Sequence, residues 1–176
     1  MGRIEVEIPK GNYENYNAVD KVIAYILRLD NMELASGCGV LMTNKKEIGK
    51  QFHIVKQFYG KTDGKQIRHI IFSVDKTLFF TPYQVKCLGN LLAQYFAKER
   101  QVVFAVHDDT GHLHIHMGIN TVAYTNGAYR AYWDIEELKA YAETCIDRLI
   151  DIVWFGKKCT PEEILCFGGM QKHKLS

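Results

Sequence analysis

The chain has 176 residues, of which 47% are hydrophobic, and this length and composition suit one compact domain with a sizeable core. Lys and Arg total 22 against 20 Asp and Glu, so the formal net charge of +2 by itself indicates neither a nucleic-acid binder nor an acidic tail. Aromatic residues make up 12% of the chain, Pro occurs three times and no heptad persists, which excludes disordered, collagen-like and coiled-coil proteins.

Targeting and redox signals are absent from the sequence. No segment approaches the roughly 20 consecutive apolar residues of a membrane span, and residues 1–17 lack the apolar core of a signal peptide. The five cysteines are odd in number and widely spaced, with no C-x-x-C pair, which favours reduced thiols over a disulfide framework or a cysteine zinc site. We therefore expect a cytoplasmic protein.

The first predicted element is a strand over residues 3–8, where polar and apolar side chains alternate. Apolar residues then recur at helical spacing over 18–29, and the following segment with Gly37 and Gly39 is expected to be a loop. The remaining elements follow from similar patterns: a helix over 44–59 that opens with a capping box of Asn44 and Glu47, a strand over 66–75, a helix over 82–100 behind the N-cap Thr81, strands over 101–106 and 113–122, a short strand near 128–132, a helix that begins at Asp134, and a short helix capped by Thr160.

This order of elements predicts an α/β fold in which a central, mainly antiparallel sheet is flanked by helices. The turn over 107–112 is short enough to make the strands on either side of it an antiparallel pair. Neither a repeat nor a linker interrupts the pattern, so we expect one domain over residues 1–176, with only 168–176 as a tail. The chain is then either whole or the N-terminal part of a longer protein.

Four of the seven histidines fall within ten residues, between His107 and His116. Alternate side chains of a strand share one face, so His112, His114 and His116 project together, and an antiparallel partner strand can bring His107 to them. Imidazole is the commonest metal ligand in proteins, and three such ligands leave coordination positions open for a substrate or water. The cluster predicts a catalytic ion; the alternative is a pH-sensitive surface strand or a set of unrelated histidines.

The segment that runs from His107-x-Asp109 through the alternating histidines to Asn120 resembles the third motif of the relaxases. This family of mobilization nucleases is built on a histidine-hydrophobic-histidine pair. What the resemblance implies is site- and strand-specific nicking and rejoining of single-stranded DNA at an origin of transfer in conjugative mobilization, with accessory relaxosome proteins as partners.

Two further segments are similar to motifs of the same family. Tyr25, within Ala-Tyr-Ile-Leu, matches the tyrosine motif, and the stretch from Lys65 to Ser73 before Thr81-Pro82 resembles the second motif. The Pro-Gly-Glu-like stretch that often follows the second-motif serine is missing here. The resemblance covers about residues 18–125.

The resemblance also implies a ligand set for a divalent ion. His107, His114 and His116 would bind it, with His112 as a further candidate. Imidazoles by themselves favour Zn, Ni or Cu over Mg, whereas the family implies Mn²⁺ or Mg²⁺ acting together with phosphate oxygens. We expect Mn²⁺ or Mg²⁺ in function and tolerance of other divalent ions in vitro.

Four polar residues complete the expected site. Asp109 would orient a ligand histidine or assist the tyrosine. Asn120 is either a hydrogen-bond partner behind the ligands or simply a strand residue. His69 and Ser73, from the second-motif segment, are either active-site residues or strand residues satisfied locally.

The expected nucleophile is Tyr25, one of ten tyrosines, with Tyr16 as the alternative. On a helical wheel Val19, Ile23 and Ile26 define the buried centre of the first helix, and Tyr25 falls on its flank, where the hydroxyl can reach a cleft. Its attack on the phosphodiester would leave a 5′-phosphotyrosine and a free 3′-hydroxyl. Because the bond is exchanged and not hydrolysed, the step is reversible.

Charge is distributed unevenly along the chain. Residues 44–68 hold seven basic and two acidic side chains, while residues 133–151 hold two basic and six acidic ones. A basic face could track phosphates, with nearby aromatic rings for bases to stack on, although a solvated helix over core aromatics explains the same pattern. The candidate DNA-binding residues are Lys45, Lys46, Lys50, Lys65 and Arg68.

Three other functions compete with a relaxase. A rolling-circle replication initiator would use the same chemistry, although the His-x-Asp lead into the histidines favours the relaxase. A nonenzymatic DNA-binding or metal-binding remnant would fit the short chain. A zinc hydrolase is disfavoured because the sequence has no His-Glu-x-x-His helix.

Overall fold

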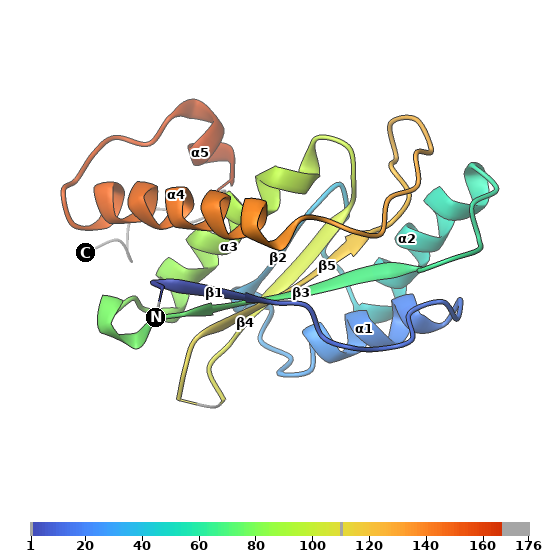
Figure 1. The fold of residues 1–176 in the computed structure, drawn as a ribbon, viewed down its shortest axis with the longest axis horizontal. Coiled ribbons are helices and arrows are strands. Elements are labelled where there is room, and N and C mark those ends of the chain that lie inside the picture. Colours follow the sequence, from blue (N-terminus) through green and yellow to red (C-terminus); the bar gives the residue numbers. More distant parts are fainter. Residues whose placement is uncertain (1, 110, 167–176) are drawn as a thin grey trace.

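The computed structural model of the chain describes residues 2–109 and 111–166, and it shows a five-stranded sheet with helices on both faces (Figure 1). All strand pairs are antiparallel, which confirms the predicted fold class. The strands are β1 (Ile4–Glu7), β2 (Ala35–Cys38), β3 (Ile67–Val74), β4 (Val102–His107) and β5 (His114–Asn120), in the spatial order β1-β3-β5-β4-β2. The helices are α1 (Ala18–Ile26), α2 (Lys45–Phe58), α3 (Pro82–Ala97), α4 (Ile135–Val153) and α5 (Pro161–Cys166), with 3-10 turns at Met32–Leu34 and Lys76–Leu78.

Each face of the sheet carries its own apolar core. Helices α3 and α4 cover the face that presents Phe72, Phe104 and Ile115. Helices α1 and α2 cover the other face, where Ile23 and the rest of the predicted stripe of α1 are fully buried. Because side chains alternate along a strand, the histidines of β4 and β5 lie on the α1 face, and the apolar residues between them fill the α3 core.

Helix α1 sits close to the sheet because β5 has a glycine beneath it. A Cβ on Gly118 would lie 2.9 Å from Cδ1 of Ile26 and 3.1 Å from Cδ1 of Ile67, closer than real Cβ contacts normally are. The missing side chain lets the end of α1 pack directly on the central strand. This packing holds Tyr25, the neighbour of Ile26, beside the histidine-bearing strand.

Two parts of the predicted secondary structure are wrong. The loop expected around Gly37 contains β2, whose small side chains, Ala-Ser-Gly-Cys, show no alternation but pair with Val102–Ala105 of β4. The strand expected near 128–132 is reduced to one isolated bridge between Val122 and Tyr129. The predicted tail, 168–176, lies outside the described residues.

The predicted helix caps are present. Asn44 accepts a hydrogen bond from the Glu47 amide at 3.0 Å, and the Glu47 carboxylate pairs with Lys50 and leaves the reciprocal half of the capping box unmade. Thr81 and Gln84 form a complete box at the start of α3. Within the described ranges, no helix is long and apolar enough to cross a membrane, and Cys145 and Cys159 are free thiols.

Candidate active site

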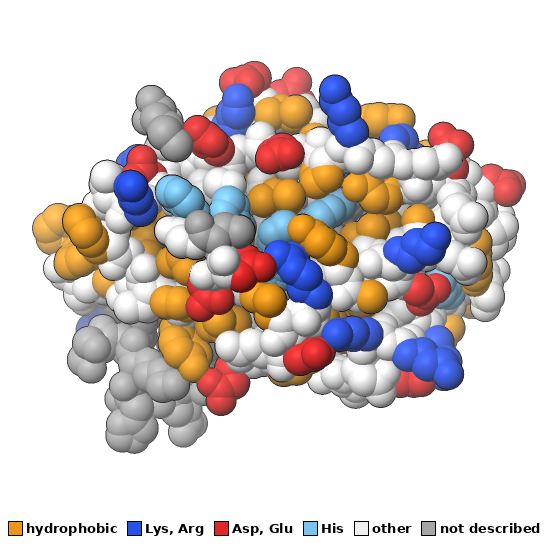
Figure 2. Space-filling view, turned by 90° about the horizontal axis from the view of Figure 1, so that it is seen from below, with side chains coloured by type: hydrophobic (Ala, Val, Ile, Leu, Met, Phe, Trp, Pro, Cys, Tyr) orange, Lys and Arg blue, Asp and Glu red, His pale blue; other side chains and the backbone are white. Residues whose placement is uncertain are grey.

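Four histidines from three adjacent strands share the α1 face of the sheet. His107 of β4 lies directly opposite His114 of β5, and His116 lies opposite Ile71 of β3, two positions beyond His69. Figure 2 shows the histidine side chains in a row across the middle of this face. The antiparallel register thus gathers histidines that are up to 47 residues apart in the chain.

The tightest part of the row is a cluster of three imidazoles with Tyr25 against it. His107 and His116 are stacked with ring centroids 4.1 Å apart, and Nε2 of His69 lies 3.2 Å from Nδ1 of His116. The ring centroid of Tyr25 is 5.4 Å from that of His116, 5.8 Å from His69 and 6.2 Å from His107. The Tyr25 side chain remains 46% exposed, so one side of its ring packs on the histidines while the residue stays accessible.

The backbone of α1 fixes the tautomer of His107. Nε2 of His107 lies 2.6 Å from the carbonyl oxygen of Ile26, and because a carbonyl only accepts, Nε2 carries the hydrogen. Nδ1 then presents a lone pair, and it is buried without a hydrogen-bond partner in the described structure. A metal-binding histidine characteristically donates its other ring N–H to a carbonyl in this way.

The histidines of the row are neutral at physiological pH. Burial, reinforced by the neighbouring His107, lowers the pKa of His69 to about 4 and that of His116 to about 3. Burial also lowers the pKa of His107 and of His114 below the ordinary range. Neutral imidazole is the form that binds metal ions.

The donor chemistry therefore fits a divalent ion, but the side chains do not converge on one point. Among residues 2–109 and 111–166, no three His, Cys, Asp or Glu side chains are arranged to hold a single ion. The ring centroid of His114 is 6.4 Å from that of His116, and its Nδ1 is 2.9 Å from the Ser73 hydroxyl. The expected ligands His107, His114 and His116 are thus neighbours in one row, with His69 packed against both Tyr25 and His116.

Asp109 contacts an arginine that the sequence analysis did not single out. Its Oδ2 accepts a hydrogen bond from Nη2 of Arg28 at 2.7 Å, which holds the pKa of the Asp109 carboxyl below its usual range. The guanidinium carbon of Arg28 lies 4.4 Å from the ring centroid of Tyr25. The available signal was the spacing, since a residue three positions after Tyr25 on a helix lies on the same side.

Two expected residues lie away from the cluster. Asn120 is fully buried, and its amide donates to the carbonyl of Phe52 and to the side chain of Gln101, so it secures the end of β5. Tyr16, the alternative nucleophile, is stacked on His53 with ring centroids 4.0 Å apart.

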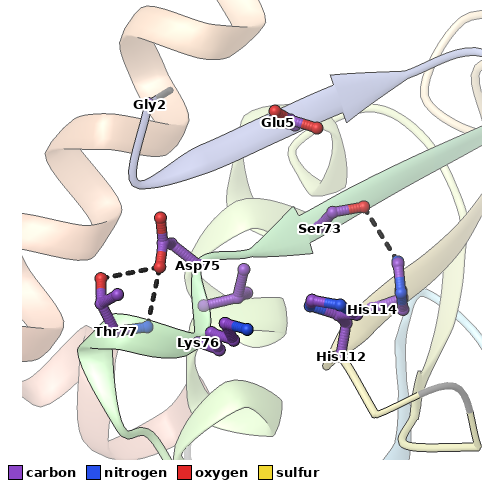
Figure 3. A pocket seen from close by; sticks show the side chains of 9 residues that line it. Gly2, Glu5, Ser73, Asp75, Lys76, Thr77, His112 and His114 are labelled. Carbon is purple, nitrogen blue, oxygen red and sulfur yellow. Dashed lines mark hydrogen bonds between the residues drawn. The ribbon is translucent and has the colours of Figure 1, made fainter.

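Two cavities flank the histidine row along β1. One, of about 440 Å³, lies between Glu5, Ser73 and the pair His112 and His114; Figure 3 shows the Ser73–His114 hydrogen bond, with His112 alongside. The other, of about 320 Å³, is lined by Glu7, Tyr13, Lys21, Tyr25 and His69 among others. The row therefore has one cavity beside Tyr25 and His69 and another beside His112 and His114.

The five basic residues expected to bind DNA do not form one patch. Lys45 pairs with Asp30 and Lys50 with Glu47, each at 2.6 Å, while Lys46 is exposed. Arg68 alternates with His69 on β3 and therefore faces the opposite side of the sheet, where Arg68 and Lys65 each lie 5.4 Å from the ring of Tyr132.

Comparison with known proteins gives consistent matches. Residues 25–147 match the family model for the relaxase nuclease domain of the MobA/VirD2-like type. Protein rlx of Staphylococcus aureus is 33% identical over 106 residues, covering 57% of this chain and 31% of that relative. A second Staphylococcus aureus protein rlx is 38% identical over 76 residues, covering 43% of this chain and 24% of that relative. The matched segments of the chain thus cover less than a third of the length of these relatives.

Proposed function

The chain belongs to the family of MobA/VirD2-like relaxase nuclease domains, and from this we propose that it nicks and rejoins single-stranded DNA at an origin of transfer during conjugative mobilization. The observation that carries the proposal is the packing of Tyr25 from α1 against His69, His107 and His116. It combines an accessible hydroxyl nucleophile with neutral imidazoles in one place.

In the proposed reaction, the phenolic oxygen of Tyr25 attacks the scissile phosphorus. A P–O bond forms to the tyrosine and the P–O3′ bond breaks. The phenolic proton passes to solvent and the leaving 3′ oxygen takes up a proton from solvent, so the released strand ends in a 3′-hydroxyl. Attack by a 3′-hydroxyl on the 5′-phosphotyrosine reverses the step and regenerates the tyrosine, because the phosphodiester is exchanged throughout. Positioning of the phenol against the phosphodiester contributes much of the rate enhancement.

We propose His107, His114 and His116 as the residues that hold a divalent ion, Mn²⁺ or Mg²⁺, with His112 and His69 as the nearest further donors. When bound, such an ion offsets the negative charge of the phosphate. The carbonyl of Ile26 orients His107, so the helix that carries Tyr25 also sets the ring nitrogen available to the ion. The Ser73 hydroxyl orients the ring of His114 through its hydrogen bond with Nδ1.

The rest of the proposal concerns the position of the DNA, the partner proteins and the place where the protein works. Single-stranded DNA would lie along the row, with Lys46 as an exposed basic residue of α2 and accessory relaxosome proteins supplying further contacts. We propose that residues 1–176 act as one nuclease domain and that the protein works in the cytoplasm.

The test is a covalent adduct. The protein is incubated with labelled single-stranded oligonucleotides that tile the DNA of its own mobile element, with Mn²⁺ or Mg²⁺, and denaturing gels are inspected for a labelled protein band. We expect an adduct that disappears in Tyr25→Phe and persists in Tyr16→Phe. Chelation with EDTA should abolish it and added Mn²⁺ should restore it. An adduct that survives in Tyr25→Phe and is lost in Tyr16→Phe would overturn the assignment.

A further inference from the structure

We propose that Arg28 is the positioning residue for Tyr25 and that Asp109 contributes to the reaction by holding Arg28 in place. This inference rests on the proposed function, because it concerns the orientation of the proposed nucleophile. It assigns a role to Arg28, which is not among the site residues expected from the sequence. Asp109 then acts through Arg28 and needs no contact with a histidine.

The first observation is the way in which the Tyr25 ring is enclosed. His69, His107 and His116 lie on one side of it, and the Arg28 guanidinium lies 4.4 Å from its centroid. The ring is otherwise 46% exposed. A guanidinium on an aromatic face is an attractive contact through the ring quadrupole and planar stacking. The contact therefore adds a second restraint to a ring that already packs against the histidines.

The second observation is the anchoring of Arg28 itself. It follows the last residues of α1, its amide donating to the carbonyl of Tyr25 at 3.2 Å, so both side chains leave the same end of the helix. Its Nη2 donates to Asp109 at 2.7 Å, and Asp109 lies in the turn between β4 and β5, two residues after His107. Asp109 thus ties the end of α1 to the histidine-bearing hairpin.

The third observation is that one donor of the half-buried Arg28 side chain is unpaired. Its Nη1 is buried and has no hydrogen-bond partner in the described structure. A buried unpaired donor costs stability. The ion pair and the ring contact therefore place the guanidinium where Tyr25 needs it, at the expense of one hydrogen bond.

The experiment compares variants in single-turnover adduct formation with the oligonucleotide that the tiling assay identifies. Arg28→Met removes the charge and keeps the aliphatic stem, while Arg28→Lys keeps the charge and loses the flat stack. With saturating oligonucleotide we expect the rate constant to fall about 10- to 100-fold in Arg28→Met and less in Arg28→Lys, with half-saturation changed less than about 3-fold. Arg3→Met removes an arginine that pairs with Glu143 and Asp147 of α4, the helix on the opposite face of the sheet from α1, and serves as the matched control.

A double-mutant cycle tests the part of Asp109. Introduced into the wild-type chain, Asp109→Asn should lower the rate of adduct formation. Introduced into Arg28→Met, it should have little further effect, because both changes remove the same contact. If the two effects multiply, Asp109 acts on the reaction directly and the inference is overturned. Circular dichroism and urea unfolding of every variant confirm that the fold is kept.

A measurement without DNA separates this inference from the proposed function. With ¹³C-labelled tyrosine, the Tyr25 ring resonance is assigned by its loss in Tyr25→Phe. Arg28→Met and Asp109→Asn should both shift it toward the values of a freely rotating exposed tyrosine, and Arg3→Met should not. An unchanged resonance in Arg28→Met overturns the positioning role. If the wild type forms no adduct but the resonance shifts as expected, the proposed function fails and the ring contact stands.

Discussion

At the scale of single residues, Lys56 of α2 shows what burial of a charge does to this protein. Its side chain is 1% exposed, and its Nζ donates to the hydroxyl of Thr121 at 3.0 Å. Burial, reinforced by Arg100, lowers the pKa of Lys56 to about 7. Above that pH the folded chain holds a neutral amine, while the unfolded chain keeps the proton to about pH 10.

This difference predicts that the free energy of unfolding rises with pH between 7 and 8.5. The unfolded state binds more protons in that range, so deprotonation favours the folded state by up to about 2 kcal/mol. Urea unfolding at both pH values measures the change. The range ends at pH 8.5 because burial raises the pKa of Cys87 to about 11 and of Cys145 to about 12. At higher pH the unfolded thiols lose protons that the folded thiols keep, so the free energy of unfolding falls.

Lys56→Met is the control for this prediction, since methionine keeps the length of the side chain and does not titrate. The variant should lose the dependence on pH over this interval. If it retains the wild-type slope, Lys56 is not its source.

Individual site residues differ in how far the sequence can identify them. The alternation of His114 and His116 is local, so their shared face follows directly from strand geometry. The contact between Arg28 and Asp109 joins residues 81 apart and depends on how α1 packs against a turn. No spacing rule specifies that distance. The hydrogen bond from His107 to Ile26 is also tertiary and could not be predicted.

At the scale of elements, the docking of α1 on β5 depends on Gly118 and Ile26. Gly118→Ala should destabilise the fold by about 1 to 3 kcal/mol, because the new methyl group would overlap Cδ1 of Ile26. Ile26→Val removes that carbon and should itself cost about 0.5 to 1.5 kcal/mol. Urea unfolding gives both values.

The double variant tests the contact. The double variant Gly118→Ala, Ile26→Val should lose less stability than the sum of the two single losses, because the shorter side chain at position 26 makes room for the new methyl group. Simple additivity would show that α1 does not rest on this glycine. Gly118→Ala should also slow adduct formation, since a displaced α1 moves Tyr25.

Elements with a clear period were predictable, and those without one were not. Helix α4 has a continuous apolar stripe and an Asp134 cap, and both are present. Strand β2 has only small residues and forms because β4 offers it an open edge. A short edge strand is stabilised by its partner more than by its own sequence.

At the scale of the whole molecule, the N-terminal segment closes the fold by pairing with α4. Arg3 of the N-terminal segment donates to Glu143 and Asp147 of α4, and α4 packs along β1. The acidic stretch of residues 133–151 is thus partly neutralised within the fold. The basic stretch is reduced in the same way by the pairs of Lys45 and Lys50.

This closure predicts that residues 1–176 unfold as one cooperative unit. Scanning calorimetry should give a single transition whose calorimetric and van't Hoff enthalpies agree, and far- and near-UV circular dichroism should report the same midpoint. Two separated transitions would contradict the proposal of a single domain.

Strand β5 lies in the centre of the sheet, so its hydrogen-bonded ladder is more constrained than the segments at the margins of the cavities. It is the third of five strands and is hydrogen-bonded to β3 and β4 along its length, so its amide protons should exchange with solvent among the slowest in the protein. The cavities beside the row are lined by β3 and His114 of β5, and at their margins by β1, by α1 and by the turn before β5. Substitutions in those marginal segments would leave the hydrogen bonds of β5 in place, so the shape and charge of the two cavities can vary while the histidine framework stays the same.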